Sequence, residues 1–329
     1  MIYVTGSLAY DFIMDYPGRF ADQIVPEKIH VINLSFLVND LRESRGGTAG
    51  NIAYNISLVN KILPKHDNAS VTLLGSLGKD HKEYVSFFKK RKVETNLIKV
   101  DKSVFTARAY ITTDLADNQL TGFYPGALKH DPSLKFPKTA AQNDIAVISP
   151  TDPTAMNNFV SQCISQKIPY IYDPGMQLPR ISNEDLQKGV THAYAIIGND
   201  YEIGLISTKL KTDILKQVVS NTHLSFIFTT LGEKGVDVYF KSDDKKRSIK
   251  LYVPAVTLTK IVDPTGAGDA FRGGLIAGLV RNYPIDICTK LATVAASYAV
   301  CEYGTMNHSF TKKVYMTRFK EMFGETLRI

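Results

Sequence analysis

The residues most suggestive of chemistry lie at positions 263–274, which read Asp-Pro-Thr-Gly-Ala-Gly-Asp-Ala-Phe-Arg-Gly-Gly. A helix is predicted to begin within this segment, because Phe271, Leu275 and Leu279 recur four residues apart, as they would on one helical face. The first backbone N–H groups of a helix lack intrahelical partners and, together with the aligned peptide dipoles, favour an anion. The segment is therefore predicted to bind a phosphate group.

Asp269 lies in the same segment, although a carboxylate repels phosphate. Its presence is explained if it removes the proton from an alcohol that attacks the bound phosphate. The alternative is a tight turn in which Asp269 only caps the helix. The surrounding sequence favours the chemical interpretation.

Four segments of the chain resemble motifs of the ribokinase-like (PfkB) carbohydrate and nucleoside kinase family. Residues 263–274 are similar to its C-terminal signature, and residues 46–51 (Gly-Gly-Thr-Ala-Gly-Asn) are similar to its substrate-side glycine loop. Residues 199–202 (Asn-Asp-Tyr-Glu) resemble its Asn-x-x-Glu motif, and residues 230–235 (Thr-Leu-Gly-Glu-Lys-Gly) resemble its nucleotide-side loop. These segments follow the family's order and cover most of the chain, so the resemblance does not depend on one motif.

The resemblance implies a kinase that transfers the γ-phosphoryl group of ATP to a hydroxyl group. It implies that Asp269 takes the proton from this hydroxyl. The backbone N–H groups that would stabilise the γ-phosphoryl group belong to Gly266, Ala267 and Gly268. In phosphoryl transfer the protein mainly positions the reactants and neutralises charge, so Asp269 need not be a strong base.

The identity of the acceptor is a separate expectation. Residues 6–11, 46–51 and 307–310 look most similar to the bacterial adenosine and nucleoside kinases, so the expected acceptor is a nucleoside, with the 5′-hydroxyl of adenosine first. The alternative is a sugar or sugar-phosphate kinase of the same family, acting on ribose- or fructose-type acceptors. A substrate panel separates the two.

Five residues are assigned to the acceptor, namely Asp11, Gly46, Gly47, Asn51 and Arg108. Asp11 follows the first predicted strand, where its carboxylate can accept two hydrogen bonds from a vicinal diol such as the ribose 2′,3′ pair. Gly46 and Gly47 would let the backbone approach that sugar, and Asn51 can both donate and accept. Arg108 would close over the phosphates or the acceptor. The alternatives are an ordinary turn residue for Asp11 and a solvent-facing strand residue for Arg108.

Six residues are assigned to the nucleotide, namely Asn199, Glu202, Thr230, Gly232, Gly235 and Asn307. Asn199 and Glu202 are three residues apart at a predicted strand-to-helix junction, so they project from nearly one helical face. Glu202 alone cannot hold Mg²⁺, which keeps several waters, so we expect a water-mediated contact. The alternatives are a capping Asn with an exposed Glu and, for the glycines, a hairpin turn. Asn307 is placed in the adenine pocket by the resemblance alone.

A monovalent cation is a further implication of the resemblance. Asp263 and Thr265 match positions that hold K⁺ in many members of the family. No local feature of the sequence adds to this expectation. The expected cofactors are therefore ATP and Mg²⁺, with K⁺ as a further candidate.

Composition and charge narrow the class of protein. The chain has 329 residues, 44% of them hydrophobic, so it can bury one large core or two smaller ones. Its net charge of +7 includes basic clusters at residues 89–92 and 246–247, but neither cluster is interleaved with aromatic residues, so we expect solvated faces and no nucleic-acid partner. A mild attraction for nucleotides is the most that this charge supports.

The expected location is the cytoplasm. No apolar run approaches the roughly 20 residues that a membrane helix needs, and no basic leader precedes the first strand, so no membrane association is expected. Cys163, Cys288 and Cys301 lack CxxC spacing and lie in apolar helical patterns, so they are expected to be buried free thiols. The protein is expected to be a monomer or a homodimer.

The pattern along the chain predicts an α/β body with a central, mostly parallel sheet and helices on both faces. The predicted strands are Ile2–Thr5, Val71–Leu77, Ile145–Ser149, Tyr170–Tyr172, Tyr194–Ile197 and Ser225–Thr230. The predicted helices between them are Asn51–Leu63, Asp80–Lys92, Thr154–Lys167 and Thr212–Thr222. Ligands of such sheets bind beyond the carboxyl ends of the strands.

Two segments interrupt this alternation. Residues 12–44 contain the β-rich run 29–38, and residues 101–126 include two predicted strands around a turn at 114–118. By resemblance they form the family's small β-sheet lid, inserted into a body made of residues 1–11, 45–100 and 127–329. The lid aromatics Phe36, Phe123 and Tyr124 would wall a planar base, although packing is the commoner role of aromatics in a sheet. An edge hairpin with no role in binding is the alternative.

Two other classes of protein are considered. A nucleotide-binding dehydrogenase is suggested by Gly266-x-Gly268, but Phe271 stands where the third glycine belongs, and the segment lies far from the first strand. There is also no Gly-Lys-Ser/Thr loop of the P-loop type. A non-catalytic nucleoside-binding regulator is disfavoured by the presence of Asp269, and release of ADP decides between regulator and kinase.

Overall fold

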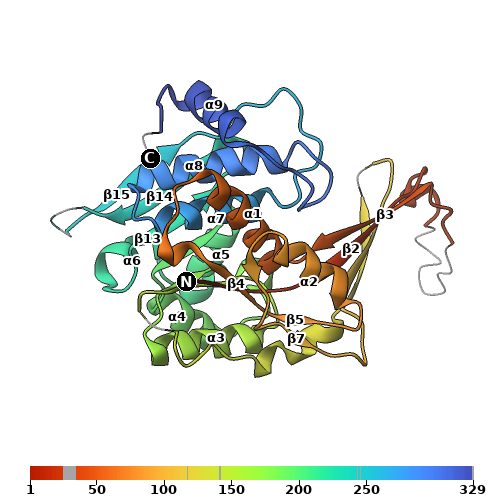
Figure 1. Cartoon of the computed structure of the whole chain (residues 1–329), viewed down its shortest axis with the longest axis horizontal. Coiled ribbons are helices and arrows are strands. Elements are labelled where there is room, and N and C mark those ends of the chain that lie inside the picture. The colour runs from red at the N-terminus through yellow and green to blue at the C-terminus, as the bar shows by residue number, and fades with distance from the viewer. Residues whose placement is uncertain (25–34, 117, 141, 243, 245, 328–329) are drawn as a thin grey trace.

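A nine-stranded sheet forms the centre of the protein in the computed structural model, which describes residues 1–24, 35–116, 118–140, 142–242, 244 and 246–327 (Figure 1). Its order is β15-β14-β13-β12-β11-β10-β1-β4-β6. All neighbours from β13 to β6 are parallel, whereas β14 is antiparallel to both β13 and β15. The strands are β1 Ile2–Thr5, β4 Val71–Leu74, β6 Val93–Glu94, β10 Ile145–Ile148, β11 Tyr170–Tyr172, β12 Ala195–Asn199, β13 Phe226–Thr230, β14 Val236–Lys241 and β15 Ser248–Val253.

Helices cover both faces of this sheet, as the sequence predicts. They are α1 Thr48–Ile62, α2 His81–Lys89, α3 Pro153–Gln166, α4 Asn183–Thr191, α5 Asp200–Leu210, α6 Ile214–Ser220, α7 Ala267–Leu279, α8 Ile285–Ala299 and α9 Lys312–Phe323. Because successive side chains of a strand point to opposite faces, Ile2 and Val4 pack with α1, α2, α7 and α8, whereas Tyr3 packs with α3 to α6. Strands covered on both faces are apolar almost throughout, which is why short continuous apolar runs predict them.

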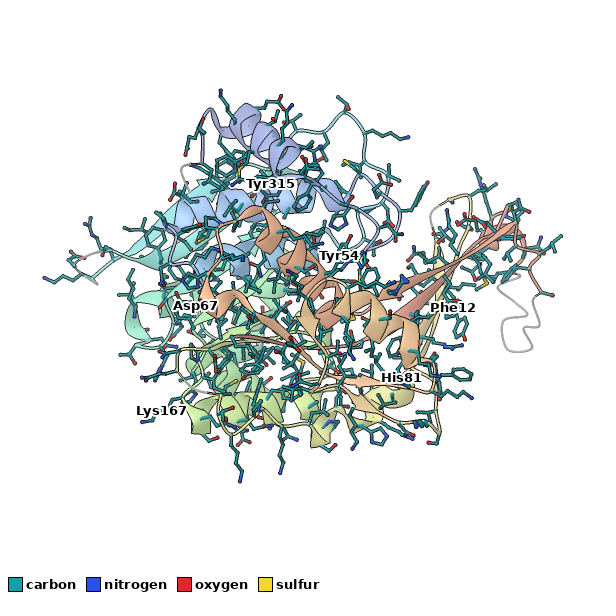
Figure 2. All side chains as sticks on the ribbon, viewed as in Figure 1. Phe12, Tyr54, Asp67, His81, Lys167 and Tyr315 are labelled. Carbon is teal, nitrogen blue, oxygen red and sulfur yellow. The ribbon has the colours of Figure 1, made fainter. Side chains whose placement is uncertain are left out.

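Some elements differ from their predictions. The predicted strand Val71–Leu77 is two strands, because β4 ends at Leu74 and Ser76–Leu77 (β5) pairs with Lys99–Val100 (β7) in a separate two-stranded sheet. Helices α4 and α9 have no counterpart in the prediction. Helix α9 covers α8 through buried Tyr315 and Phe319, and Figure 2 shows Tyr315 at this end of the molecule. Of the three free cysteines, Cys163 and Cys288 are buried as expected, whereas Cys301 follows α8 and is half-buried.

A separate four-stranded sheet of order β3-β2-β8-β9 projects from the body (Figure 1). Its strands are β2 Ala9–Asp15, β3 Asp40–Gly46, β8 Ala107–Thr113 and β9 Gln119–Tyr124. Strands β8 and β9 lie where two strands are predicted around residues 114–118. The β-rich run predicted at 29–38 falls partly outside the described residues, and residues 35–38 form no strand. The strand of that segment is β3, which pairs in register with β2 from Asp40 to Gly46.

This second sheet has wider limits than the predicted lid. Strand β2 begins at Ala9 and β3 runs to Gly46, beyond the predicted limits of 12 and 44. Phe12 lies on this projecting sheet (Figure 2). The division of the chain into a body and a moving lid remains a prediction.

Candidate functional site

The N-terminus of α7 is built as the sequence predicts. Gly266 is the N-cap, with φ 81°, a left-handed conformation that glycine adopts without a steric penalty. Ala267 and Gly268 open the helix, and Asp269 lies in its first turn. Within the described part of the chain the N–H groups of Gly266 and Gly268 have no acceptor, whereas that of Ala267 reaches the Pro264 carbonyl at 3.3 Å. Two unpartnered donors at a helix start are suited to an anion.

Asp269 is held by a hydrogen-bonded chain that reaches across the site. The Asn51 amide nitrogen donates to Asp269 Oδ2 at 2.7 Å, and the Thr305 hydroxyl donates to Asn51 Oδ1 at 2.6 Å. Both ends of the Asn51 amide are therefore occupied by protein partners. These contacts orient Asp269, and the contact of Asn51 with the acceptor remains a prediction.

The Asp269 carboxyl group has a pKa raised to about 7. Burial is the main cause because it penalises the charged form, and the negative charges of Asp173 and Asp11 add to it. The guanidinium of Arg272 and the hydrogen bond from Asn51 oppose this shift. A group that titrates near neutral pH is suited to accept a proton from an alcohol during attack.

A buried ion pair lies beside Asp269. Arg272 donates to both carboxylate oxygens of Asp173, with Nε to Oδ2 at 2.5 Å and Nη2 to Oδ1 at 2.8 Å. Its Nη1 also donates to the Gly268 carbonyl at 3.0 Å, which ties the guanidinium to the first turn of α7. The pair places one positive and one negative charge within electrostatic range of Asp269. Sequence reasoning assigns no role to Arg272, although Asp173 follows β11 at the sheet edge where such sites form.

Asp11 lies in β2 against the glycine loop. A Cβ atom on Gly46 would stand 2.0 Å from Asp11 Oδ2, so only glycine leaves room for this carboxylate. Gly47 is the N-cap of α1, the helix that carries Asn51. Burial raises the pKa of Asp11 to about 6, and its charge contributes to the raised pKa of Asp269. The structure thus brings the predicted acceptor residues to the side of the predicted base.

Arg108 does not reach into this site. It lies in β8 and forms an ion pair with Asp80 at 2.7 Å, while its guanidinium lies 4.0 Å from the centre of the Phe105 ring. It is therefore neither the solvent-facing strand residue nor a free cation above the acceptor. Its contacts join the projecting sheet to the N-cap of α2.

The lid aromatics are divided between two environments. Phe36 packs on Tyr16 and Phe20, with ring centres 4.9 and 5.1 Å apart, so it stabilises its own segment. Phe123 and Tyr124 in β9 are exposed. Phe123 pairs with Ala109, which pairs with Asp11, so Phe123 shares the Asp11 face of the sheet, whereas Tyr124 takes the other face.

A cavity of about 610 Å³ adjoins the N-terminal part of α7. Its lining includes Thr230, Gly232 and Gly235, together with Ala267 and Gly268. The alanine-rich part of α8 also lines the cavity. The other lining residues are Glu233, Lys234, Val236, Ala255, Val256, Thr257, Leu258, Ile261, Pro264 and Phe271, with Thr293, Ala296, Ser297 and Val300 from α8 and its C-terminal end. The sequence assigns no role to 255–261. A largely apolar cleft that ends at the first turn of a helix, where the Gly268 N–H is free, can bind a planar base with its phosphates.

Asn199 and Glu202 form a reciprocal capping box at the start of α5. The Glu202 N–H donates to Asn199 Oδ1 and the Asn199 N–H donates to Glu202 Oε2, both at 2.8 Å. Burial raises the pKa of Glu202, and Asp173 and Arg272 lie within electrostatic range of it. One oxygen of Glu202 is thus occupied, and in the described residues no three His, Cys, Asp or Glu side chains cluster as a metal site. This donor set fits Mg²⁺ only with water and phosphate oxygens as the other ligands.

The remaining assigned residues hold loops together. Asp263 accepts hydrogen bonds from the Thr265 N–H at 2.9 Å and the Gly304 N–H at 3.0 Å, so it ties two loops beside α7. Asn307 is exposed, donates to the Tyr303 carbonyl at 2.7 Å and does not line the 610 Å³ cavity. The predicted place of Asn307 in the adenine pocket is therefore not supported by its position.

Comparisons with known proteins agree with this geometry. The nucleoside kinase of Methanocaldococcus jannaschii is 28% identical over 276 residues, which cover 83% of this chain and 85% of that protein. Its crystal structure, described as an archaeal member of the ribokinase family, matches with a TM-score of 0.82 and covers 97% of this chain and 98% of that one. The Burkholderia thailandensis nucleoside kinase in complex with inosine matches with a TM-score of 0.84 at 28% identity, covering 99% and 100% of the two chains.

The family model described as "pfkB family carbohydrate kinase" matches residues 1–312. The match includes the glycine loop before α1, the start of α5 and the first turn of α7. The ribokinase-like fold and the family expected from the sequence motifs are thereby confirmed. No helix of the described residues has the length and apolar character needed to cross a membrane. The chain belongs to the pfkB family of carbohydrate kinases.

Proposed function

We propose that this enzyme transfers the γ-phosphoryl group of ATP to the 5′-hydroxyl of a nucleoside, with adenosine as the acceptor. The observation that carries the proposal is the place of Asp269. It lies in the first turn of α7, directly after Ala267 and Gly268, which line the nucleotide-sized cavity, and the charge of Asp11 contributes to its raised pKa of about 7. A proton acceptor at this point can serve a hydroxyl on one side and a terminal phosphate on the other.

Each residue of the site then has one task. Asp269 accepts the hydroxyl proton as the oxygen attacks the γ-phosphorus, and the bond from that phosphorus to ADP breaks. The N–H groups of Gly266 and Gly268 stabilise the charge on the transferred group. Asn51 keeps the base in place, and Asp11 accepts hydrogen bonds from the sugar hydroxyls.

The choice of a nucleoside rests on the relatives. The Burkholderia thailandensis enzyme is 30% identical in its complex with ADP-inosine, a match with a TM-score of 0.78 that covers 99% of this chain and 97% of that one. The exposed Phe123 on the Asp11 face gives this chain an aromatic side chain suited to a planar base. Adenosine, rather than inosine, is proposed on the similarity of residues 6–11, 46–51 and 307–310.

The metal ions are part of the proposal. Mg²⁺ bound by the ATP phosphates would reach Glu202 through water and would neutralise charge on the phosphates. K⁺ would lie by Asp263 and Thr265, whose loop adjoins the α7 N-terminus. A cytoplasmic, reducing location is proposed because all three cysteines are free thiols.

The test is ADP formation from MgATP with a panel of acceptors. The panel contains adenosine, inosine, guanosine, cytidine, ribose and fructose phosphates, each with wild type and Asp269→Asn. Adenosine should give the highest kcat/KM, and K⁺ in place of Na⁺ should raise it. If a sugar gives a higher kcat/KM than every nucleoside, the sugar-kinase alternative replaces the nucleoside assignment. If ADP formation never exceeds the ATP-only background, kinase activity on these acceptors is refuted.

A further inference from the structure

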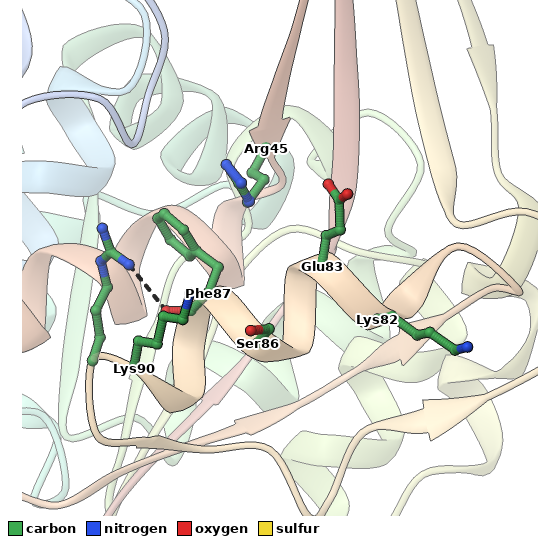
Figure 3. A pocket seen from close by; sticks show the side chains of 7 residues that line it. Arg45, Lys82, Glu83, Ser86, Phe87 and Lys90 are labelled. Carbon is green, nitrogen blue, oxygen red and sulfur yellow. Dashed lines mark hydrogen bonds between the residues drawn. The ribbon is translucent and has the colours of Figure 1, made fainter.

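A basic groove lies on α2, outside the site described above. Its cavity measures about 500 Å³, and Figure 3 shows the side chains that line it, which include Arg45, Lys82, Phe87, Lys90 and Arg91. Glu83 is the one carboxylate of the lining, against four cationic side chains. A neighbouring hollow of about 340 Å³ shares Lys82 and Lys90, so the cationic surface continues along α2. None of these residues has a role in the proposed kinase reaction.

The guanidinium groups of two of these cations are held in place by contacts with the ring of Phe87. The Arg91 guanidinium lies 3.6 Å from the centre of the Phe87 ring, and Nη1 donates to the Phe87 carbonyl at 3.0 Å. The Arg45 guanidinium lies 4.3 Å from the same ring centre. The solvated face predicted for residues 89–92 is therefore wrong for Arg91, although Lys89, Lys90 and Lys92 are exposed.

These cations lack negative partners. The Nε atoms of Arg45 and Arg91 are buried with no hydrogen-bond acceptor, and in the described residues no carboxylate forms an ion pair with Arg45, Arg91, Lys82 or Lys90. The guanidinium groups of Arg45 and Arg91 lie over one ring, and Lys82 and Lys90 complete the cationic lining, so the groove carries positive charge that a bound anion would offset. The fork of N–H donors on arginine matches the oxygens of phosphate.

The groove is connected to the acceptor loop through both of its walls. Arg45 directly precedes Gly46, and its carbonyl accepts a hydrogen bond from the Thr305 hydroxyl, the group that also holds Asn51. On the other wall, Tyr84 of α2 donates to the Gly46 carbonyl at 2.8 Å. A ligand that draws Arg45 and α2 together would therefore act on the loop that carries the acceptor residues.

We propose that this groove binds a diphosphate-bearing small molecule and that its occupancy changes the affinity for the acceptor. The four cations exceed what one phosphate group needs, and the cavity is larger than a single phosphate. A nucleic acid fits less well, because the guanidinium groups lie over the ring of Phe87, the aromatic residue of the lining on which a base would stack.

The binding test is isothermal titration of pyrophosphate into the full chain in the absence of nucleotide, with the contribution of the groove measured as the difference between wild type and a groove variant. The double variant Lys82→Gln/Lys90→Gln changes only exposed side chains, so it should fold normally. We expect about tenfold weaker pyrophosphate binding or more in this variant, because hydrogen bonds to charged groups are lost. The matched control Lys167→Gln/Lys313→Gln removes two exposed lysines on other elements and should bind as wild type; Figure 2 shows Lys167 far from His81, the first residue of α2.

Further measurements distinguish the source of the diphosphate and test the coupling. If nucleotides are the natural ligand, ADP alone should bind at two sites per chain in wild type and at one site in Lys82→Gln/Lys90→Gln. One ADP site in both proteins would indicate that the natural ligand is a free oligophosphate. Pyrophosphate should change the acceptor KM at least threefold in wild type and leave it unchanged in the double variant.

Three outcomes would overturn the proposal. Equal pyrophosphate binding by wild type and the double variant would show that the groove is not the binding site, whatever the acceptor of the kinase proves to be. Binding of a single-stranded oligonucleotide without binding of pyrophosphate would show that the groove binds nucleic acid and not a small diphosphate. Unchanged acceptor KM on saturation with pyrophosphate would refute the coupling.

Discussion

The pH dependence of turnover gives the sharpest test of the role of Asp269. If this carboxylate is the base, it must be ionised to act, so kcat/KM should fall as the pH decreases through its raised pKa of about 7. Asp269→Asn removes the group, so it should lower kcat by roughly 10²–10⁴-fold, the usual effect of a positioned base. It should also remove the part of the acid limb that is centred near pH 7, and leave only the fall near pH 6 that Asp11 and the nucleotide phosphate contribute.

The magnitude of the limb follows from the surroundings of Asp269. Two pH units below its pKa only about 1% of a carboxyl group is ionised, so at pH 5 kcat/KM should be roughly 100-fold below its plateau. A carboxyl with the ordinary value of 3.8 would remain ionised at that pH, and it would contribute no acid limb above pH 5. The fall in kcat/KM between pH 7 and pH 5 therefore measures how far burial raises the pKa of Asp269.

The assay is initial-rate ADP release at saturating Mg²⁺ from pH 5 to pH 9, with folding of each variant verified by circular dichroism and thermal melting. The matched control is Asp67→Asn, the same substitution at an exposed carboxylate (Figure 2), which should reproduce the wild-type profile. A phosphate of the nucleotide also titrates near pH 6, but its contribution is common to all three proteins. An acid limb in Asp269→Asn with the same midpoint and depth as in wild type, or turnover close to wild type, would refute the assignment of the base.

Three further substitutions test the neighbours of Asp269. Asn51→Ala removes the 2.7 Å hydrogen bond that stabilises the Asp269 carboxylate, so its pKa should rise and the acid limb should move to higher pH; a limb displaced to lower pH would contradict this. Asp11→Ala should raise the acceptor KM by about 10- to 100-fold, because hydrogen bonds from the acceptor to a charged group are lost, and should change the ATP KM little. An unchanged acceptor KM would show that Asp11 does not bind the acceptor. Asp173→Asn leaves Arg272 buried without its charge partner and should lower the free energy of unfolding by about 3 kcal/mol or more, measured by urea denaturation, whereas a loss below about 1 kcal/mol would show that the pair is solvated.

The sequence by itself determined the class of fold and the place of the proposed base at the start of a helix. Short apolar runs alternating with helical spacing define a parallel sheet covered on both faces, because a strand buried on both sides needs apolar residues throughout. The small residues before Asp269 place the start of α7 within a residue of where it lies. Both signals are local, so they can be read from neighbours along the chain.

Only the tertiary structure decided which residues meet. Asn51 and Asp269 are 218 positions apart, and Asp173 and Arg272 are 99 apart, so their contacts depend on the order of the strands and the packing of α1 on α7. The same holds for Arg108, which the sequence places in the site and which the ion pair with Asp80 holds outside it. The pKa of a carboxyl group depends on burial and on charges that are distant in sequence, and for this reason the sequence names the base whereas only the fold sets its proton affinity.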